Sequence, residues 1–564
     1  MMKKLLFTCM LLVAGWSYGQ AQSWQWGKGG GSADAGSGGP DETVIDMAID
    51  PHGNIYVLST VWQTALRVDG HSLTGYGYED VLISSFKCDG TYRWSKNIGS
   101  NSQDIGRAIK TDTLGGVYVS GLLACDYLTD HIDIDSTWSG RSYKFIFLLK
   151  YDTAGNYKWL RMPEPDSITV FGTGSNTYDL DVDGGGNSFM LCKLNPGAFG
   201  NGGYVVSSPG QYILKYDKNG NFSGGHPMQI TGDVGGTLKR DQQLGRYYIT
   251  GALSGLPYFN TTPITSSQFI GCFDNSGNLM WVKQGTDYPS DYSNFARVSI
   301  DPMHNLYLTS RGSGSDTFGT FIQTNAGSAS PIVYKLDTNG NVIWAKNATV
   351  NGVTNSSTII TDGREVIVAG CNPGLLKWPS YADSLNQDFG GGYSIYATRF
   401  NAITGQVLGI DSLKSDFGVN NNSTALAMDK FGNYYLGGNF ASYLYVPVPG
   451  DTLANIGGGS DFFVAKFGRT NCTVPISLEV EPVQVSNLND IRVFPNPSKD
   501  ELNITEVGKN VDYALYNITG KCMMQGHLNE GRNTLDMLHL VAGIYILEMK
   551  SSDGERKVVR VAKD

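Results

Sequence analysis

Short acidic turns of the form Asp-x-x-Gly-Asn are a recurring group of potential metal ligands. They include DKNGN at 217–221, DNSGN at 274–278, DTNGN at 337–341 and DVDGGGN at 181–187. Spaced Asp and Asn oxygens suit Ca²⁺, but none of these turns has the distant bidentate Glu of an EF-hand. Gly and Asn also tolerate the positive φ of tight hairpins, so the same residues predict structural turns. We therefore predict no cofactor, with Ca²⁺ at these turns as the alternative.

Acid–base catalysis on a polysaccharide is a second candidate chemistry. Long connections that differ from one repeat to the next contain five acids: Glu164, Asp166, Asp287, Asp291 and Asp416. Glycoside hydrolysis needs two carboxylates about 5 to 10 Å apart, and the sequence does not show which acids approach one another. Solvated loop acids explain them more simply. Motifs of the G-x-S-x-G, H-E-x-x-H and phosphate-loop types are absent from the sequence, so we predict no catalytic residue.

Aromatic side chains in the long connections are the third candidate. This set comprises Tyr76, Tyr78, Tyr127, Trp138, Tyr143, Tyr258, Phe259, Trp378, Tyr381 and Tyr443. Exposed rings suit sugars or partner proteins, whereas the alternative is that they fill small loop cores. We predict that ligand contacts come from the long inserts at 124–144 and 371–393, through Tyr127, Trp138, Trp378 and Tyr381.

Two alternating motifs between residues 24 and 468 position all of these groups. The first is an acidic turn and a strand, in seven copies: DPHGNIYVL (50–58), DTLGGVYVSG (112–121), DGGGNSFML (183–191), DQQLGRYYITG (241–251), DPMHNLYL (301–308), DGREVIVAG (362–370) and DKFGNYYLGG (429–438). The second is a hairpin that often ends in Trp, as in FKCDGTYRW (86–94). Two hairpins every sixty-odd residues make four antiparallel strands per unit, which predicts a seven-bladed β-propeller over 22–468.

The order of strands, a to d in each blade, also predicts two unlike faces. The a–b and c–d connections are tight turns, whereas the b–c and d–a connections are long and variable, so they emerge on the opposite face. The segment WQWGK at 24–28 matches the fourth strand of other blades. We predict that it pairs with 461–467 and closes the ring, which removes open sheet edges. The Trp of this strand, followed two residues later by Lys or Arg in five blades, predicts packing between blades with a snorkelling cation rather than a cation site.

The N-terminal residues and the composition indicate in which compartment the protein works. Residues 1–21 combine Lys3 and Lys4 with an apolar stretch and then small residues, which predicts a secretory signal peptide. The sequence has 72 glycines, 17% charged residues and a net charge of −10, without a basic stripe for nucleic acid. No stretch after the signal resembles a transmembrane helix. The cysteines are scattered and never in C-x-x-C spacing, so neither a disulfide framework nor a zinc site is indicated.

Two resemblances follow from these motifs. Residues 24–468 resemble the bacterial seven-bladed propeller repeat family, which implies a fold and no fixed activity. The C-terminal residues 491–564 contain a second motif, made of Pro495, Asn496, Pro497, Gly520, Gly543, Tyr545 and Lys557. With these residues the segment resembles the C-terminal type A sorting domain of the type IX secretion system of Bacteroidetes. This second resemblance implies a small antiparallel β-sandwich that engages the secretion machinery, with 469–490 as the linker.

The expected protein is therefore all-β and secreted or attached to the outer-membrane surface. We expect a binding module for a glycan or a protein on the variable propeller face. A polysaccharide lyase or glycoside hydrolase using the loop acids is one alternative, and a structural surface component is the other.

Overall fold

The computed structural model describes most of the chain, and every structural statement below concerns the described residues. These are 22–32, 41–100, 102–124, 145–163, 174–200, 203–286, 297–314, 317–322, 325–352, 354–386, 393–415, 422–448, 450–457, 459–468, 491–507, 511–551 and 556–564. The predicted signal peptide and linker lie outside them. The described residues form strands throughout, and they contain no helix that is long and apolar enough to cross a membrane. The chain divides into two compact units, Met1–Cys472 and Thr473–Asp564.

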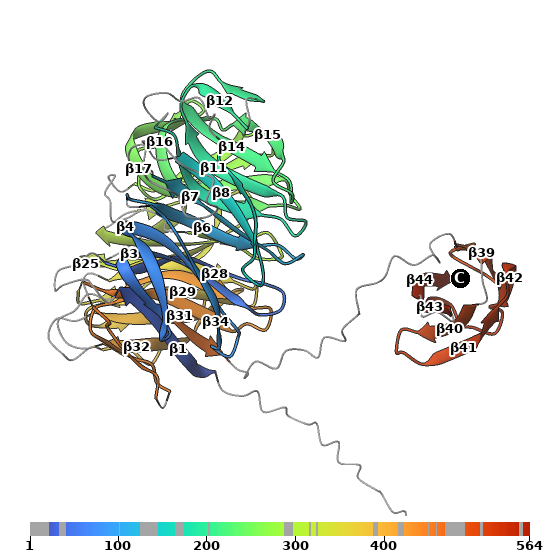
Figure 1. The fold of residues 1–564 in the computed structure, drawn as a ribbon. Helices are drawn as coiled ribbons and strands as arrows, with labels where there is room; N and C mark the ends of the chain where they lie inside the picture. Colours follow the sequence, from blue (N-terminus) through green and yellow to red (C-terminus); the bar gives the residue numbers. More distant parts are fainter. Residues whose placement is uncertain are drawn as a thin grey trace, which may run out of the picture. The chain divides into compact units, whose positions relative to one another are not determined.

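The first unit is built from four-stranded antiparallel sheets, with strands in the order a to d (Figure 1). The a strands are β2 (Thr43–Ile49), β6 (Ile105–Thr111), β10 (Asn176–Val182), β16 (Ile230–Asp241), β21 (Val298–Ile300), β28 (Asn355–Thr361) and β33 (Asn422–Met428). The b strands are β3 (Ile55–Val68), β7 (Gly116–Leu123), β11 (Ser188–Leu194), β17 (Arg246–Phe259), β22 (Leu306–Gly314), β29 (Glu365–Asn372) and β34 (Tyr434–Phe440).

The outer two strands of each sheet complete the units. The c strands are β4 (His71–Phe86), β8 (Phe145–Asp152), β14 (Gly210–Tyr216), β19 (Phe269–Asp274), β25 (Asn325–Leu336), β31 (Ser394–Asn401) and β37 (Asp461–Gly468). The d strands are β5 (Tyr92–Ile98), β9 (Tyr157–Arg161), β15 (Phe222–Pro227), β20 (Leu279–Gln284), β26 (Val342–Asn347), β32 (Val407–Ser415) and, from the N-terminus, β1 (Ser23–Ser32). These described strands make seven four-stranded units.

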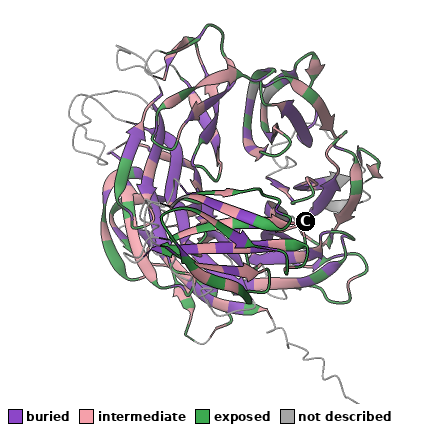
Figure 2. Cartoon of the chain, turned by 90° about the vertical axis from the view of Figure 1, so that its right-hand side faces the viewer, coloured by how far each residue is buried: buried purple, intermediate pink, exposed green. Residues whose placement is uncertain are grey.

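The a strands form a closed cycle. Each contacts the a strand of the next unit, in the order β2, β6, β10, β16, β21, β28, β33 and back to β2. A cycle of sheets around a central axis is the architecture of a β-propeller, with the a strands lining the channel. Figure 2 shows the buried positions running along the strands, with exposed positions in the connections.

The N-terminal strand closes this ring as predicted. β1 pairs antiparallel with β37, and Trp24, Trp26 and Lys28 stand opposite Phe467, Lys466 and Val464. The end of β1 also pairs with β3, which joins the last sheet to the first. This second pairing was not predicted, because the b–c connection of the first unit was expected to be a long loop. Instead β3 and β4 extend into one hairpin whose turn is Asp69 and Gly70.

Short additional strands lie within the other connections. These are the hairpins β12 (Gly197–Phe199) with β13 (Tyr204–Val206), β23 (Thr317–Phe318) with β24 (Phe321–Ile322) and β35 (Tyr443–Tyr445) with β36 (Thr452–Ala454), the pair β27 (Thr349–Val350) with β30 (Leu376–Lys377), and β18 (Thr262–Pro263) beside β17. The connections therefore differ from unit to unit, as the sequence indicates.

Adjacent sheets are held together by the recurring Trp. Its indole Nε1 donates to a carbonyl of the c–d turn in the next sheet, for example from Trp94 to Thr153 at 3.0 Å and from Trp281 to Thr338 at 3.2 Å. The ring lies against the turn glycine: a Cβ on Gly155 would lie 2.7 Å from Trp94, and one on Gly340 would lie 2.8 Å from Trp281. The prediction that these Trp residues pack between blades is confirmed.

The second unit is a small sandwich of two antiparallel sheets. One contains β38 (Arg492–Phe494), β39 (Glu501–Val507) and β42 (Gly531–Asp536). The other contains β41 (Cys522–Leu528), β40 (Val511–Asn517), β43 (Gly543–Ser551) and β44 (Arg556–Lys563). Both sheets contribute to one apolar core that includes Leu502, Leu515, Leu547 and Val561. The predicted sandwich is confirmed.

Candidate functional site: the charged end of the propeller channel

Two positions recur in the segment that leads into each acidic turn, four and two residues before its aspartate. The fourth-from-turn residues are Asp46, Ala108, Asp179, Thr237, Arg297, Thr358 and Ala425. The second-from-turn residues are Ala48, Lys110, Asp181, Lys239, Ser299, Ile360 and Ala427. In five of the a strands a β-bulge just precedes the fourth-from-turn residue, as between Val44 and Asp46. Such a bulge re-aims the side chains that follow it.

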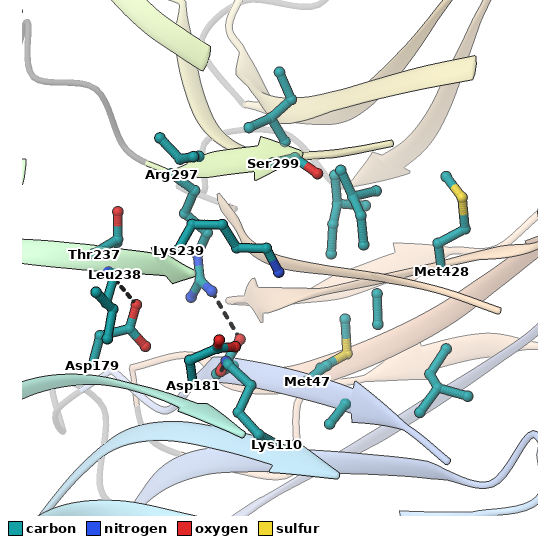
Figure 3. Close-up of a pocket in the computed structure, with 18 of the residues that line it drawn as sticks. Met47, Lys110, Asp179, Asp181, Thr237, Leu238, Lys239, Arg297, Ser299 and Met428 are labelled. Carbon is teal, nitrogen blue, oxygen red and sulfur yellow. Dashed lines mark hydrogen bonds and ion pairs between the residues drawn. The ribbon is translucent and has the colours of Figure 1, made fainter. Parts of the chain in front are cut away.

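Most of these residues surround one cavity of about 300 Å³ (Figure 3). We call it the channel cavity. Its walls are formed by Asp46, Met47, Ala48, Ile49, Lys110, Thr111, Asp179, Asp181, Val182, Thr237, Leu238, Lys239, Arg297, Val298, Ser299, Ile359, Ile360, Leu426, Ala427 and Met428. All of them lie within the four residues that precede an acidic turn. The cavity therefore lies at the end of the channel next to the tight turns, not on the variable face.

Asp46 is the centre of a charged network in this cavity. Its Oδ2 accepts from Lys110 Nζ at 2.5 Å and from the Ile109 backbone N–H at 3.1 Å. Its Oδ1 accepts from Arg297 Nη1 at 2.8 Å. Arg297 immediately precedes β21, which is not a neighbour of β2 in the ring, so this ion pair spans the channel. The second Arg297 nitrogen donates to the Ile45 carbonyl at 2.9 Å, which fixes the guanidinium in this position.

The surroundings shift the pKa values of Asp46, Asp179 and Asp181 in different directions. Burial alone would raise the pKa of Asp46, but Lys110 and Arg297 outweigh it and hold that pKa below its usual value. Burial raises the pKa of Asp179, which accepts from the Leu238 N–H at 2.8 Å, and burial also raises the pKa of Asp181 against the attraction of Lys239. Asp46 is therefore the ionised acid, while Asp179 and Asp181 are shifted toward the neutral form.

The cavity has a polar side and an apolar side. The charged residues come from the first five a strands, whereas β28 and β33 contribute Ile359, Ile360, Leu426, Ala427 and Met428. A pocket with an apolar wall and a few convergent polar groups is typical of a small-molecule site. Its lining contains no Cys or His, and the described residues contain no group of three or more His, Cys, Asp or Glu that could hold a metal ion.

The aspartates of the acidic turns have a structural role in the described copies. Asp337 Oδ1 accepts from the backbone N–H groups of Asn339 and Asn341, both at 2.8 Å, and its Oδ2 accepts from the Asn341 amide at 2.9 Å. The same contacts recur at Asp152, Asp183, Asp217 and Asp274. Both carboxylate oxygens thus face the turn's own donors, which supports the interpretation of these residues as turn formers.

The acidic turn at 301–305 has a histidine in place of glycine. His304 occupies the glycine position of its turn and adopts φ of 65°. Its Nδ1 lies 2.6 Å from Asp241 Oδ2 in the preceding acidic turn. This contact links two adjacent sheets on the tight-turn face, so His304 contributes to packing there.

The predicted aromatic site is not assembled on the described part of the variable face. Trp378 has no exposed surface: its Nε1 donates to Thr398 Oγ1 at 2.9 Å and its ring packs edge-on against Phe400, with centroids 4.9 Å apart. The expected exposed platform at Trp378 is therefore contradicted, because the insert folds its ring into the core. Tyr381 is half-buried against the same core. Tyr127 and Trp138 lie outside the described residues.

The other sequence candidates have mixed outcomes. Phe259 is buried, whereas Tyr78, Tyr258 and Tyr443 are exposed. The acids considered for glycoside chemistry, Glu164, Asp166, Asp287, Asp291 and Asp416, lie outside the described residues. Cys272 and Cys522 are free, whereas Cys88 is disulfide-bonded, which no spacing pattern indicated.

The sorting-domain residues hold the ends of the second unit together. Asn496 donates to the Arg560 carbonyl at 2.7 Å and accepts from the Ala562 N–H at 2.8 Å, and the flanking Pro495 and Pro497 are exposed. Lys557 Nζ donates to the Ile491 carbonyl at 2.7 Å. These contacts attach the first segment of the unit to its last strand.

The remaining motif residues shape the turns of this unit. Gly520 adopts φ of 80° in the turn between β40 and β41. Gly543 begins β43, and the buried Tyr545 donates from its hydroxyl to the Val541 carbonyl at 2.7 Å. All seven motif residues therefore have a position within the second unit, and none contributes to the channel cavity.

Comparisons with solved structures give remote likenesses. PorZ, a surface component of the type IX secretion system of Porphyromonas gingivalis, is 8% identical over 92% of this chain and 81% of its own, with a TM-score of 0.27. The extracellular domain of BT4673 from B. thetaiotaomicron is 11% identical over 92% and 86%, with a TM-score of 0.22. The β-propeller domain of the Trilobed protease from Pyrococcus furiosus is 7% identical over 78% and 99%, with a TM-score of 0.36. Scores of this size carry no argument about function.

The second unit matches a known protein family. No curated protein matches the chain. Residues 492–562 match the model described as "Secretion system C-terminal sorting domain". The chain is thus a cargo of the type IX secretion system, exported to the cell surface or secreted, and its C-terminal unit belongs to the family of secretion-system sorting domains.

Proposed function

We propose that the propeller is an extracellular binding module whose ligand site is the channel cavity. The observation that carries this proposal is the cavity itself. It has one apolar wall and one wall of convergent charged and hydroxyl groups, and its volume of about 300 Å³ is at the lower end for ligand pockets. A ligand of about the size of one sugar unit or one amino acid fits this volume.

Binding is favoured over catalysis by how the acids are engaged. Asp46 accepts from two cations and a backbone N–H, so it is poorly placed to act as a base or nucleophile. The lining also lacks a Cys or His nucleophile or base. The polysaccharide-active alternative depends on loop acids outside the described residues. No described feature favours the purely structural alternative.

A variant that fills the cavity tests this proposal. Ala427 is buried in the apolar wall, so Ala427→Trp would occupy the cavity, whereas the exposed Ala154 on a tight turn offers a matched Ala154→Trp control. The full chain would be screened by calorimetry against neutral, acidic and amino sugars, amino acids and small organic acids, after thermal unfolding confirms that both variants are folded.

We expect at least one solute to bind the wild type and the Ala154→Trp control, and to lose at least tenfold in affinity with Ala427→Trp. Binding that survives in a folded Ala427→Trp protein would place the site elsewhere. Absence of binding by every solute would contradict the small-ligand module.

A further inference from the structure

The channel cavity contains a cation without a partner. Among the described residues, Lys239 Nζ takes part in no hydrogen bond or ion pair, in contrast to Lys110 and Arg297, which both bind Asp46. Figure 3 shows the Lys239 side chain extending into the cavity. Asp181 attracts this charge, but no ion pair forms between the two among the described residues. Lys239 is half-buried, so its charge is partly removed from water and no hydrogen bond or ion pair from the protein replaces that water.

A hydroxyl without a partner lines the same wall. Thr237 Oγ1 is buried and, in the described part of the chain, has no hydrogen-bond partner. Thr237 is two residues before Lys239 on β16, so both side chains point to the same side of the strand. Ser299, on the adjacent β21, accepts from the Thr361 N–H at 3.1 Å, which leaves its hydroxyl hydrogen available to a ligand. Because Thr237 Oγ1 is covered by protein, the accessible donor along this wall is the Lys239 ammonium group.

The cavity is lined by three acids, Asp46, Asp179 and Asp181, and by three cations, Lys110, Lys239 and Arg297. Burial alone would lower the pKa of Lys110 and of Arg297, but the attraction of Asp46 outweighs it and raises both pKa values, so both side chains stay charged. Burial shifts Asp179 and Asp181 toward the neutral form, because it raises the pKa of each carboxyl. Asp46 already binds two of the three cations, so Lys239 is the cation that remains for an anionic ligand.

We propose that the channel cavity binds a small organic acid, with the ligand carboxylate at Lys239. This inference rests on the proposed function and specifies its ligand class. The rest of the ligand lies against Ile360, Leu426 and Met428, a wall that suits the C–H face of a sugar ring or a short hydrocarbon. The carboxylate supplies both the counter-charge and the hydrogen-bond acceptor that the protein leaves out.

The experiment compares an acid with its neutral counterpart. D-glucuronate, D-galacturonate, succinate and neutral D-glucose would be titrated by calorimetry into the full chain. Lys239→Met removes the charge at similar length, Lys239→Arg restores it, and Lys96→Met on the exposed outer strand β5 is the matched control.

We expect at least one of the three acids to bind at least tenfold more tightly than glucose. Lys239→Met should reduce that affinity at least tenfold, Lys239→Arg should restore most of it, and Lys96→Met should leave it unchanged. Each variant is checked by thermal unfolding, and if Lys239→Met fails to fold it is replaced by Lys239→Gln, which also removes the charge and should weaken the same acid severalfold.

The outcomes separate the two claims. If a neutral or cationic solute binds, is lost with Ala427→Trp and is unaffected by Lys239→Met, the binding module stands and the acidic ligand class is wrong. If an acid binds equally well in the wild type and in folded Lys239→Met, the position of its carboxylate is wrong. If no solute binds, both proposals fail.

Discussion

Replacement of Glu42 by Gln should change how the stability of the propeller depends on pH. Glu42 and Asp461 are both buried where the ring closes, at 2% and 0% exposure. A Cβ on Gly31 would lie 2.5 Å from Glu42 Oε2 and 2.3 Å from Asp461 Oδ1, so the two carboxyl groups flank the same point. Asp461 Oδ1 has no hydrogen-bond partner among the described residues. Two carboxylates in such a place cannot both be ionised cheaply.

The sign and size of the effect follow from the pKa values. Burial raises the pKa of Glu42 from 4.5 to about 7, and burial together with the charge of Glu42 raises the pKa of Asp461 from 3.8 to about 8. The folded protein then holds protons that the unfolded chain has released, so the free energy of unfolding falls as pH rises from about 4 to about 8. For Glu42 alone, roughly 2.5 pKa units correspond to about 3 kcal/mol.

Replacing the Glu42 carboxyl by an amide removes this pH-dependent loss of stability, but it also costs one hydrogen bond. Glu42 Oε1 accepts from Ser32 Oγ and from the Trp62 N–H, and a Gln oxygen can retain both bonds. Its NH₂ group replaces the oxygen that accepts from the Ser32 N–H, which costs about 1 kcal/mol, and it can donate to Asp461. We therefore expect Glu42→Gln to stabilise the protein by about 2 kcal/mol at pH 8.5 and to destabilise it by about 1 kcal/mol at pH 4.5.

The assay is urea unfolding of the full chain between pH 4.5 and 9, followed by tryptophan fluorescence. Asp383→Asn, at an exposed acid, is the control and should leave the wild-type pH profile unchanged. A Glu42→Gln protein that is destabilised equally at pH 4.5 and 8.5 would refute the reasoning. So would a wild-type stability that is flat across this range.

Three further predictions concern packing and export. Gly340→Ala should destabilise the propeller by about 2 to 3 kcal/mol in urea unfolding, because its Cβ would press on Trp281 at positive φ; Gly70→Ala, with equal φ strain but no neighbour within 4 Å, should cost only about 1 kcal/mol. Trp378→Ala should destabilise by about 3 to 5 kcal/mol in the same assay, and a loss of ligand binding without loss of stability would contradict its structural role. Deletion of 491–564 should prevent export across the outer membrane, so cell fractionation should find the protein in the periplasm, while the circular dichroism spectrum of the propeller stays unchanged. Normal export of the deletion variant would contradict the sorting role.

Much of the fold could be predicted because the turns carry local information. Each Asp-x-x-Gly-Asn turn fixes where two strands meet, and the Trp register of 24–28 indicates which strand lacks a partner. The extension of β3 and β4 into one hairpin that also pairs with β1 could not be predicted, since it depends on which strands become neighbours after the ring closes.

The candidate site was harder to find because channel positions are defined by the closed ring. A signal was present nonetheless. Counting back four and two residues from each turn aspartate gives Asp46, Lys110, Arg297 and their equivalents, which are charged in five of the seven copies. The predicted ligand contact at Trp378 is wrong, because a sequence does not show whether a long connection folds its rings inward or presents them to solvent.

The most direct test of the account is a crystal structure of the chain with the tightest-binding solute from the calorimetric screen. We expect ligand density in the channel between Lys239 and Ile360, with the Arg297–Asp46 ion pair intact beside it. Density on the variable face, with an unoccupied channel in the same crystal, would contradict it.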